Sequence, residues 1–226
     1  MNKSSLIASI YKSRETILEQ LEMQGYDISN YKGIDINEIN SAYESSMLDM
    51  IVEKKEEDTE DGQEFKGERE IISKKLYVNY SIDGKLSQTK IQALIDDLFI
   101  TEEILGMNDT LFIISDSDPN ATMNNFIHHI WEKDKIFVVI QSIKRLKFNV
   151  LLHVLQPKFR ILSDLEVNDV KKRYNIIDDK NWPEISRFDP VCKATFIRPG
   201  QIFEVLRPSR TALVSPYYLM CISISQ

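Results

Sequence analysis

The sequence predicts an α/β protein in which small sheets are covered by helices. In the middle of the chain, residues 111–115 and 136–140 are short apolar runs typical of buried strands, and residues 76–82 alternate as a strand does. Residues 87–100 and 120–133 carry apolar side chains at helical spacing instead. Strands that alternate with helices favour a small sheet with helical cover.

Two helices are expected ahead of this alternation. Residues 5–24 place apolar side chains on one stripe, which predicts a helix packed on its own domain and ended by Gly25. A second short helix is predicted over 37–52. Residues 53–70 hold nine acidic and four basic residues, so we expect a solvated acidic loop or insertion, with an acidic binding tail as the alternative.

A second, smaller mixed α/β domain is expected over 148–226, after a first domain over 1–147. Ser163 and Glu166 fit a capping box at the start of a helix that runs to about Tyr174. Asp189 and Pro190 fit the first turn of a short helix. The other predicted elements are a strand over 148–155, a turn at Pro199-Gly200, a strand over 201–207, a loop over 208–216 and a closing strand over 217–223.

Composition narrows the class of protein. The chain has 226 residues, no apolar run near the roughly 20 residues of a membrane span, and a beginning that reads as a helix rather than a signal peptide. Its two cysteines lack the CxxC spacing of zinc sites, which favours a reducing, intracellular compartment. From Leu151 on there are 11 Lys and Arg against 8 Asp and Glu, and before it 17 against 27. A protein that grips DNA alone usually has a basic face, which this chain lacks.

Catalytic patterns are not evident, so we expect no catalytic residue, metal or cofactor of the chain's own. His128 and His129 are neighbours on a predicted helix, where side chains point about 100° apart and do not form a ligand pair. There is no nucleophile elbow and no glycine-rich phosphate loop. The enzymatic alternative is a metal-dependent nuclease, because Asp83-Gly84-Lys85 gives an acid-x-lysine triplet. That triplet lies in a predicted turn, without an acidic strand end before it.

Residues 152–226 carry an ordered series of short motifs. They are His153, Pro157-Lys158, Arg160, Leu162-Ser163-Asp164, Arg173-Tyr174, Trp182-Pro183, Asp189-Pro190-Val191, Pro199-Gly200-Gln201-Ile202, Val205-Leu206-Arg207-Pro208-Ser209 and Thr211-Ala212. In order and spacing the series resembles the assembly domain of the fifth shared subunit of nuclear RNA polymerases and of its archaeal counterpart. The resemblance implies a non-catalytic subunit of a DNA-directed RNA polymerase, with a free-standing transcription adaptor as the alternative.

The same resemblance extends more weakly to the N-terminal part. The eukaryotic subunit has a jaw domain that opens with a helix ending near a Gly-Tyr pair, as Gly25-Tyr26 does here. Its Thr-Pro-Ser-Ala turn lies near downstream DNA, and the similar place here holds Asp118, Pro119, Asn120 and Ala121. The resemblance thus implies that Pro119, Asn120 and Ala121 are close to DNA, although the threonine and serine are not kept.

The resemblance also implies partners and an interface. The partners are the largest polymerase subunit, other subunits and, weakly, downstream duplex DNA, with no membrane. The docking elements are residues 157–164, 189–190 and 199–211, with strand pairing and packing against the largest subunit. The implied interface residues are Pro157, Lys158, Arg160, Asp189, Pro190, Pro199, Gly200, Arg207, Pro208 and Thr211. Arg207 is expected to make a charge-assisted hydrogen bond there, and Asp189 to cap its own helix.

Several positions depart from the family pattern. Arg210 stands where the family has glutamate, Leu213-Val214 replace glycine-arginine, Leu219 replaces arginine, and the helix end over 192–197 differs. These departures favour a divergent polymerase with an altered partner surface, such as that of a large DNA virus. The expected compartment is the nucleus for a cellular protein, and the host cytoplasm or the virion for a viral one.

Overall fold

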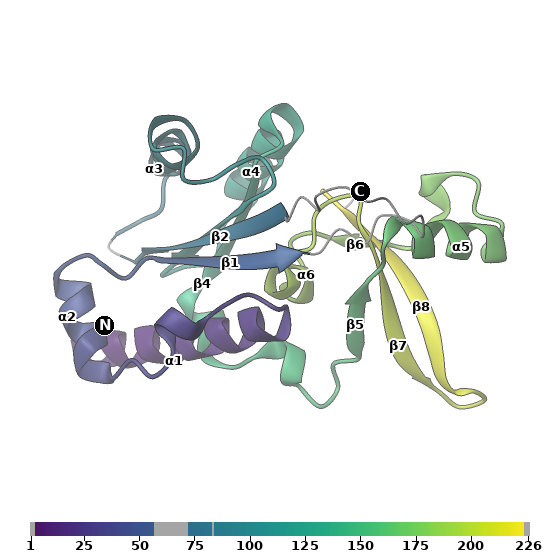
Figure 1. Cartoon of the computed structure of the whole chain (residues 1–226), viewed down its shortest axis with the longest axis horizontal. Coiled ribbons are helices and arrows are strands. Elements are labelled where there is room, and N and C mark those ends of the chain that lie inside the picture. The colour runs from purple at the N-terminus through teal and green to yellow at the C-terminus, as the bar shows by residue number, and fades with distance from the viewer. Residues whose placement is uncertain (1–2, 57–71, 83, 224–226) are drawn as a thin grey trace, which may run out of the picture. The chain divides into compact units, whose positions relative to one another are not determined.

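The computed structural model describes residues 3–56, 72–82 and 84–223 (Figure 1). The chain divides into two compact units, Met1–Phe148 and Asn149–Gln226. Both units combine a small sheet with helices, which confirms the predicted α/β class. Within the described ranges, every helix is too short or too polar to cross a membrane.

The N-terminal unit contains a four-stranded sheet in the order β1-β2-β3-β4. Its strands are β1 (Met50–Glu56), β2 (Ile72–Ser81), β3 (Thr110–Ser115) and β4 (Phe137–Ser142). β1 runs antiparallel to β2, whereas β2, β3 and β4 are parallel. All residues of β3 and β4 are buried. Their sequences are continuously apolar because a parallel strand covered on both faces has no solvent side.

Helices cover both faces of this sheet (Figure 1). On one face, α3 (Gln88–Ile95), the π-helical turn η2 (Asp96–Thr101) and α4 (Ala121–Asp134) share a core cluster with Leu111, Ile113, Val138 and Ile140. On the other face lies α1 (Lys3–Met23), whose Ile10, Ile17 and Leu21 are fully buried. It packs against α2 (Ile36–Glu44) and the 3-10 segment η3 (Ile143–Lys147), and a further 3-10 turn, η1 (Ser29–Tyr31), follows it.

The C-terminal unit contains a second four-stranded sheet, in the order β5-β7-β8-β6. Its strands are β5 (Lys158–Ile161), β6 (Glu184–Ser186), β7 (Ile202–Ser209) and β8 (Leu213–Ile222). β7 pairs antiparallel with both β5 and β8, and the short β6 runs parallel to the end of β8. The helical segments are η4 (Val150–Leu152), α5 (Asp164–Tyr174), η5 (Asp179–Asn181) and α6 (Pro190–Thr195).

Alternate residues of this sheet form two small cores. Phe203, Val205 and Cys221 pack with Cys192 of α6 on one face. Ile202 packs with Val170 of α5 and with Trp182 on the other face. The strict alternation along β7 follows from the two-residue period of a strand.

Most of the predicted elements are confirmed, but the strand predicted over 148–155 is wrong. This segment forms the turn η4 and an exposed stretch after it. The Asn149 side chain accepts a hydrogen bond from the backbone N–H of Leu151 at 3.1 Å. Such a local bond offers the backbone an alternative to a strand ladder. The strand of this region is β5 instead, which the sequence reading missed.

Two further parts of the predicted secondary structure are corrected, one around residue 50 and the other over residues 208–216. The helix predicted over 37–52 ends at Glu44, and Met50 already belongs to β1. Consequently residues 53–56 of the predicted acidic loop are in a strand, paired with β2, and residues 57–70 lie outside the described residues. The loop predicted over 208–216 is also wrong, because β7 continues to Ser209 and β8 begins at Leu213. Pro208 and Pro216 mislead the sequence reading, although an unpaired strand edge tolerates proline.

Candidate interaction surfaces

The loop that the resemblance places near DNA joins β3 to α4 at the carboxyl ends of the parallel strands. Asn120 caps α4, its side-chain oxygen accepting a hydrogen bond from the Met123 N–H at 2.9 Å. Ala121 is the first residue of the helix, and Pro119 before them is half-buried. The three predicted residues are therefore adjacent on the surface of the N-terminal unit.

The charges of this loop are balanced within the unit. The Arg145 Nε donates to Asp118 at 2.7 Å, and the Lys144 ammonium lies 3.5 Å from the Asp116 carboxylate. The hydrogen bond to Asp118 raises the pKa of Arg145. A DNA phosphate would have to compete with these carboxylates for the two cations, so the loop by itself offers little attraction to DNA.

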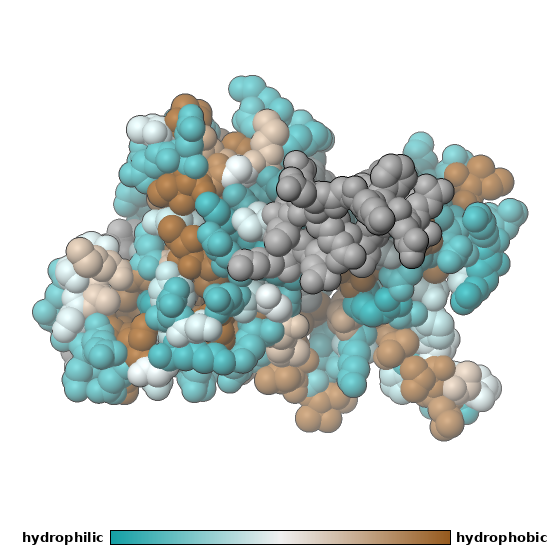
Figure 2. All heavy atoms as spheres, viewed as in Figure 1, coloured by the Kyte–Doolittle hydropathy of each residue, from teal (hydrophilic) through white to brown (hydrophobic). Residues whose placement is uncertain are grey.

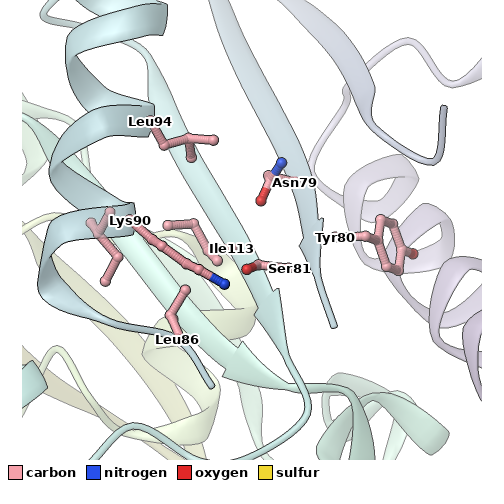
Figure 3. A pocket seen from close by; sticks show the side chains of 8 residues that line it. Asn79, Tyr80, Ser81, Leu86, Lys90, Leu94 and Ile113 are labelled. Carbon is pink, nitrogen blue, oxygen red and sulfur yellow. The ribbon is translucent and has the colours of Figure 1, made fainter. Parts of the chain in front are cut away.

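A cleft of about 300 Å³ lies beside the end of β2 (Figure 3). Figure 3 shows Lys90 reaching along it toward Ser81, over Leu86 and Ile113, whereas Tyr80 points away from it. No carboxylate is found among the described residues that line the cleft. Of the nuclease triplet, Asp83 lies outside the described residues, and Gly84 and Lys85 are exposed beyond the end of β2. The cleft thus offers one cation but, in its described lining, no carboxylate to hold a metal.

In the C-terminal unit, Arg160 organises a network inside the fold. From β5 it bonds to the Glu166 carboxylate on α5 and to Glu204 on β7, the latter at 3.1 Å. The hydrogen bond from Arg160 is the main effect that lowers the pKa of Glu166, followed by the hydrogen bond from the Ser163 backbone N–H. Glu166 thereby completes the predicted capping box with Ser163. Arg160 joins a strand to a helix, so its visible contacts are internal ones.

A second group of predicted interface residues lies near the start of β7. Asp189 caps α6, as predicted, by accepting a hydrogen bond from the Val191 N–H at 2.9 Å, and Pro190 occupies the first turn. Pro199 and Gly200 form the predicted turn, in which Gly200 has φ +92. Its N–H donates to the Cys221 carbonyl at 2.8 Å. These residues shape the fold locally, since a positive φ favours glycine.

The remaining predicted residues gather at the other end of the sheet. Lys158 of β5 is directly opposite Leu206 of β7, which brings Pro157 and Lys158 beside the exposed Arg207 and Pro208. Thr211 lies in the turn of the β7–β8 hairpin. The Arg207 guanidinium stacks on the Tyr217 ring at 3.8 Å from its centre. The structure thus separates the predicted interface into two groups, with Arg160 between them.

Exposed apolar side chains at this end of the sheet were missed by the sequence reading. Val154 and Leu155 are 95% and 84% exposed, and Leu213 in the hairpin is 86% exposed. Figure 2 shows hydrophobic residues at the tip of the hairpin and in the segment before β5. Residues 150–155 are apolar apart from His153, a pattern that is equally typical of a buried strand, so the sequence alone did not reveal this exposure. Together with Leu206 and Val214, these residues form what we call the apolar end of the C-terminal sheet.

The described contacts of His128, His153 and the two cysteines are those of residues in the fold, without the arrangement of a metal or catalytic site. His128 lies 3.2 Å from Glu132 on α4, and His153 is exposed, its Nδ1 accepting from the Leu155 N–H at 3.2 Å. The sequence reading placed His153 in a strand, which is wrong. Cys192 and Cys221 are free and buried. A hydrogen bond with Cys221, and then burial, raises the pKa of Cys192, so this thiol stays protonated at neutral pH.

Within the described part of the chain, no group of three or more His, Cys, Asp or Glu side chains could hold a metal ion. The notable features are instead a charge-balanced loop and an exposed apolar sheet end. The exposed apolar sheet end is suited to contacts with other macromolecules.

Comparison with known proteins relates the chain to subunits of DNA-directed RNA polymerases. Residues 148–221 match the family "RNA polymerase Rpb5, C-terminal domain". The DNA-directed RNA polymerase subunit Rpo5 of Pyrococcus abyssi is 42% identical over 72 residues, 32% of this chain and 87% of that relative. Its counterpart in Methanosarcina mazei is 36% identical over 76 residues, 34% of this chain and 96% of the relative. The DNA-directed RNA polymerases IV and V subunit 5B of Arabidopsis thaliana is 24% identical over 198 residues, 86% of this chain and 81% of the relative.

The fold and these matches define a class of protein, an α/β interaction protein whose C-terminal unit is a module found nearly alone in the archaeal relatives. The Arabidopsis relative extends the similarity into the N-terminal unit. The chain belongs to the Rpb5/Rpo5 family of DNA-directed RNA polymerase subunits, which confirms the resemblance read from its motifs.

Proposed function

We propose that the chain serves as a non-catalytic subunit of a multisubunit DNA-directed RNA polymerase, in which other subunits add the nucleotides. The observation that carries the proposal is family membership over residues 148–221, the segment with the exposed apolar sheet end. A subunit of this kind contributes assembly and shape rather than reactive groups.

The C-terminal unit is the proposed assembly domain, residues 148–226, and its partner is the largest subunit. Val154, Leu155 and Leu213 are the strongest attachment points, because large exposed apolar side chains gain most from being covered. Arg207, held flat on Tyr217, is well placed at the same end for a charge-assisted hydrogen bond. The edge of β5 adds unpaired backbone groups for strand pairing in the part of the chain that the structure describes.

The N-terminal unit is the proposed jaw domain, residues 1–147, beside downstream DNA. The loop of Pro119, Asn120 and Ala121 is its proposed DNA-facing part. Since Asp116 and Asp118 pair with the nearby cations, this domain acts as a steric wall with weak electrostatic attraction. Other subunits supply the positive charge that holds the duplex.

The proposed compartment of the chain is that of the polymerase to which it belongs. In a cellular organism the proposed site of action is the nucleus, and in a large DNA virus it is the host cytoplasm or the virion. A lysine- and isoleucine-rich sequence and the departures at Arg210, Leu213 and Leu219 support the divergent, viral version.

Co-purification tests the proposed function. The tagged full chain, expressed in its own host, should recover the two largest polymerase subunits in stoichiometric amounts. Deleting residues 152–226 should abolish the recovery, whereas deleting residues 57–70 should leave it intact. A chain that stays monomeric and never recovers polymerase would favour the free-standing adaptor, and equal loss from both deletions would contradict the two-domain assignment.

A further inference from the structure

An exposed acidic surface lies in the N-terminal unit, at the carboxyl end of the helix that begins with α3. α3 passes directly into η2, so residues 88–101 form one continuous helical stretch. Asp97, Glu102 and Glu103 lie at its end, and all three are exposed. The Glu102 N–H donates to the Asp97 carbonyl at 2.8 Å, which keeps these two residues adjacent. We call Asp97, Ile100, Glu102 and Glu103 the acidic helix end.

The negative charge of this surface is not balanced by neighbours along the chain. Residues 91–127 hold seven acidic residues and no Lys, Arg or His. Four of the seven have partners within the N-terminal unit: Asp96, Asp109, Asp116 and Asp118. The other three are the carboxylates of the acidic helix end, and they form no ion pair with any residue that the structure describes. Their charge is therefore available to a cation from outside the unit.

Local stability does not account for these acidic residues. The carboxyl end of a helix carries a partial negative charge, so acidic side chains are unfavourable there and cations are favourable. The helical stretch has no acidic residue in the first turn of α3 and no basic residue in the last turn of η2. α5 shows the favourable order instead, with acidic residues in its first turn and basic residues in its last. An external cation would thus stabilise the acidic helix end.

Apolar side chains are exposed beside the carboxylates. Ile100, between them in the sequence, is 68% exposed. On the nearby sheet edge, Ile51 of β1 is 38% exposed and lies directly opposite Tyr77 of β2. Burial, and then the hydrogen bond to Asp49, raise the pKa of Tyr77, and the charge of Glu102 adds to this effect, so Glu102 is close to the strand pair. A ligand of this surface therefore meets apolar groups as well as negative charge.

We propose that the acidic helix end binds a basic, partly apolar segment of a partner protein. Lysines or arginines of the segment face the three carboxylates, and an apolar side chain covers Ile100. Nucleic acid does not suit this surface, because the carboxylates repel phosphates. A single metal ion does not suit it either, because within the described ranges no three acidic side chains are grouped to hold one. Cations spaced along a peptide match carboxylates that are spread over a helix end.

A peptide titration of the full chain tests the proposal. The probe is a fluorescently labelled peptide of about twelve residues that alternates lysine with leucine, and its binding is measured by anisotropy at low salt. We expect the peptide to bind, and the same peptide with serine in place of leucine to bind more weakly. A peptide with glutamate in place of lysine should not bind the unchanged chain.

Two matched variants separate this surface from the overall negative charge of the protein. The site variant combines Asp97→Lys with Glu102→Lys, and the control combines Asp134→Lys with Asp169→Lys, both at exposed residues. Each reversal adds two charges, so either pair changes the net charge from −7 to −3. The site variant should weaken binding of the lysine peptide about 10- to 30-fold at low salt, and the control less than about threefold. The difference should shrink in about 1 M salt.

Two further measurements check the physical reasons. The glutamate peptide should bind the site variant better than the control variant, because the charges of site and peptide are then exchanged. The Tm of the site variant should not fall below that of the unchanged chain, because cations are favourable at a helix carboxyl end.

Four results would overturn the inference. Equal weakening by the site and control variants would reduce the binding to net charge, and equal binding of the serine peptide would remove the apolar contact. Equal binding of the glutamate peptide to both variants would contradict the charge pairing. A lower Tm of the site variant would show that the carboxylates stabilise the fold itself. None of these outcomes bears on assembly with polymerase, which the co-purification experiment measures.

Discussion

Replacing Val154 and Leu155 by aspartate should separate folding from assembly. Both side chains are almost fully exposed in the chain alone, at 95% and 84%. They follow the turn η4 and precede β5, and neither belongs to a core cluster of the described residues. The free energy of unfolding of the double variant should therefore lie within about 0.5 kcal/mol of that of the unchanged chain, as for surface substitutions.

The effect on assembly should be large. Covering a valine or leucine side chain completely contributes about 1.5 to 3 kcal/mol, so the pair contributes about 3 to 6 kcal/mol at most. Even if partial coverage reduces the loss to about 2 to 3 kcal/mol, association weakens between about 30-fold and about 150-fold. A buried aspartate without a partner adds to the loss, because a charge must be desolvated.

The assay is co-purification of the largest subunit with the tagged chain, and urea denaturation checks folding. Met107→Asp is the control, because Met107 is 72% exposed but lies in the N-terminal unit. We expect polymerase recovery to fail for the double variant and to persist for the control. Full recovery with the double variant would refute the reasoning that the apolar end of the C-terminal sheet is the docking surface.

Three further predictions concern single interactions. The pKa of Glu166 is lowered mainly by Arg160, so the Glu166 carboxylate stabilises the fold above the ordinary carboxyl pKa, and this stabilisation is lost as the pH falls through the folded-state pKa. Between about pH 6 and pH 3 the Tm should therefore fall more for the unchanged chain than for Glu166→Gln. Parallel curves of Tm against pH would contradict this. Asp118→Asn should release Arg145 and raise DNA affinity of the assembled polymerase about two- to fivefold at low salt, measured by anisotropy, whereas an unchanged affinity would argue against a DNA-facing loop. Ellman's reagent should find no reactive thiol in the folded chain and two in denaturant, because both cysteines are buried; rapid reaction of the folded chain would contradict the packing.

The elements that the sequence predicted well have strong local signals. The buried strands β3 and β4 are apolar at every central position, and the helices α5 and α6 begin at residues whose side chains bond the first free N–H groups. Failures occurred where a segment's pairing depends on distant residues. Nothing local marks Met50–Glu56 as a strand rather than the end of a helix and the start of a loop, because its strand is defined by the facing residues of β2. The hairpin at 208–216 was missed for the same reason.

The interface residues named from the sequence stay a prediction, but their contacts within the unit are known. Asp189 was expected to cap its own helix, and it does. Arg160 was expected at the interface, and its exposed guanidinium bonds two glutamates of the same unit. The exposure of Val154 and Leu155 could not be read from composition, because an apolar run is equally typical of a buried strand.

These contacts explain why the motif series identifies the family so well, because many of its residues hold the module itself together. Ser163 and Asp189 cap helices, Gly200 supplies a positive φ, and Arg160 ties β5 to α5 and β7. Each is required by the module itself, whatever chain it binds. Leu213 is 86% exposed, at a position where the sequence departs from the family pattern, so its side chain contributes little to the packing of the module. Partner choice should therefore change through such exposed apolar positions, at little cost in stability, while substitutions at the caps should destabilise the module regardless of partner.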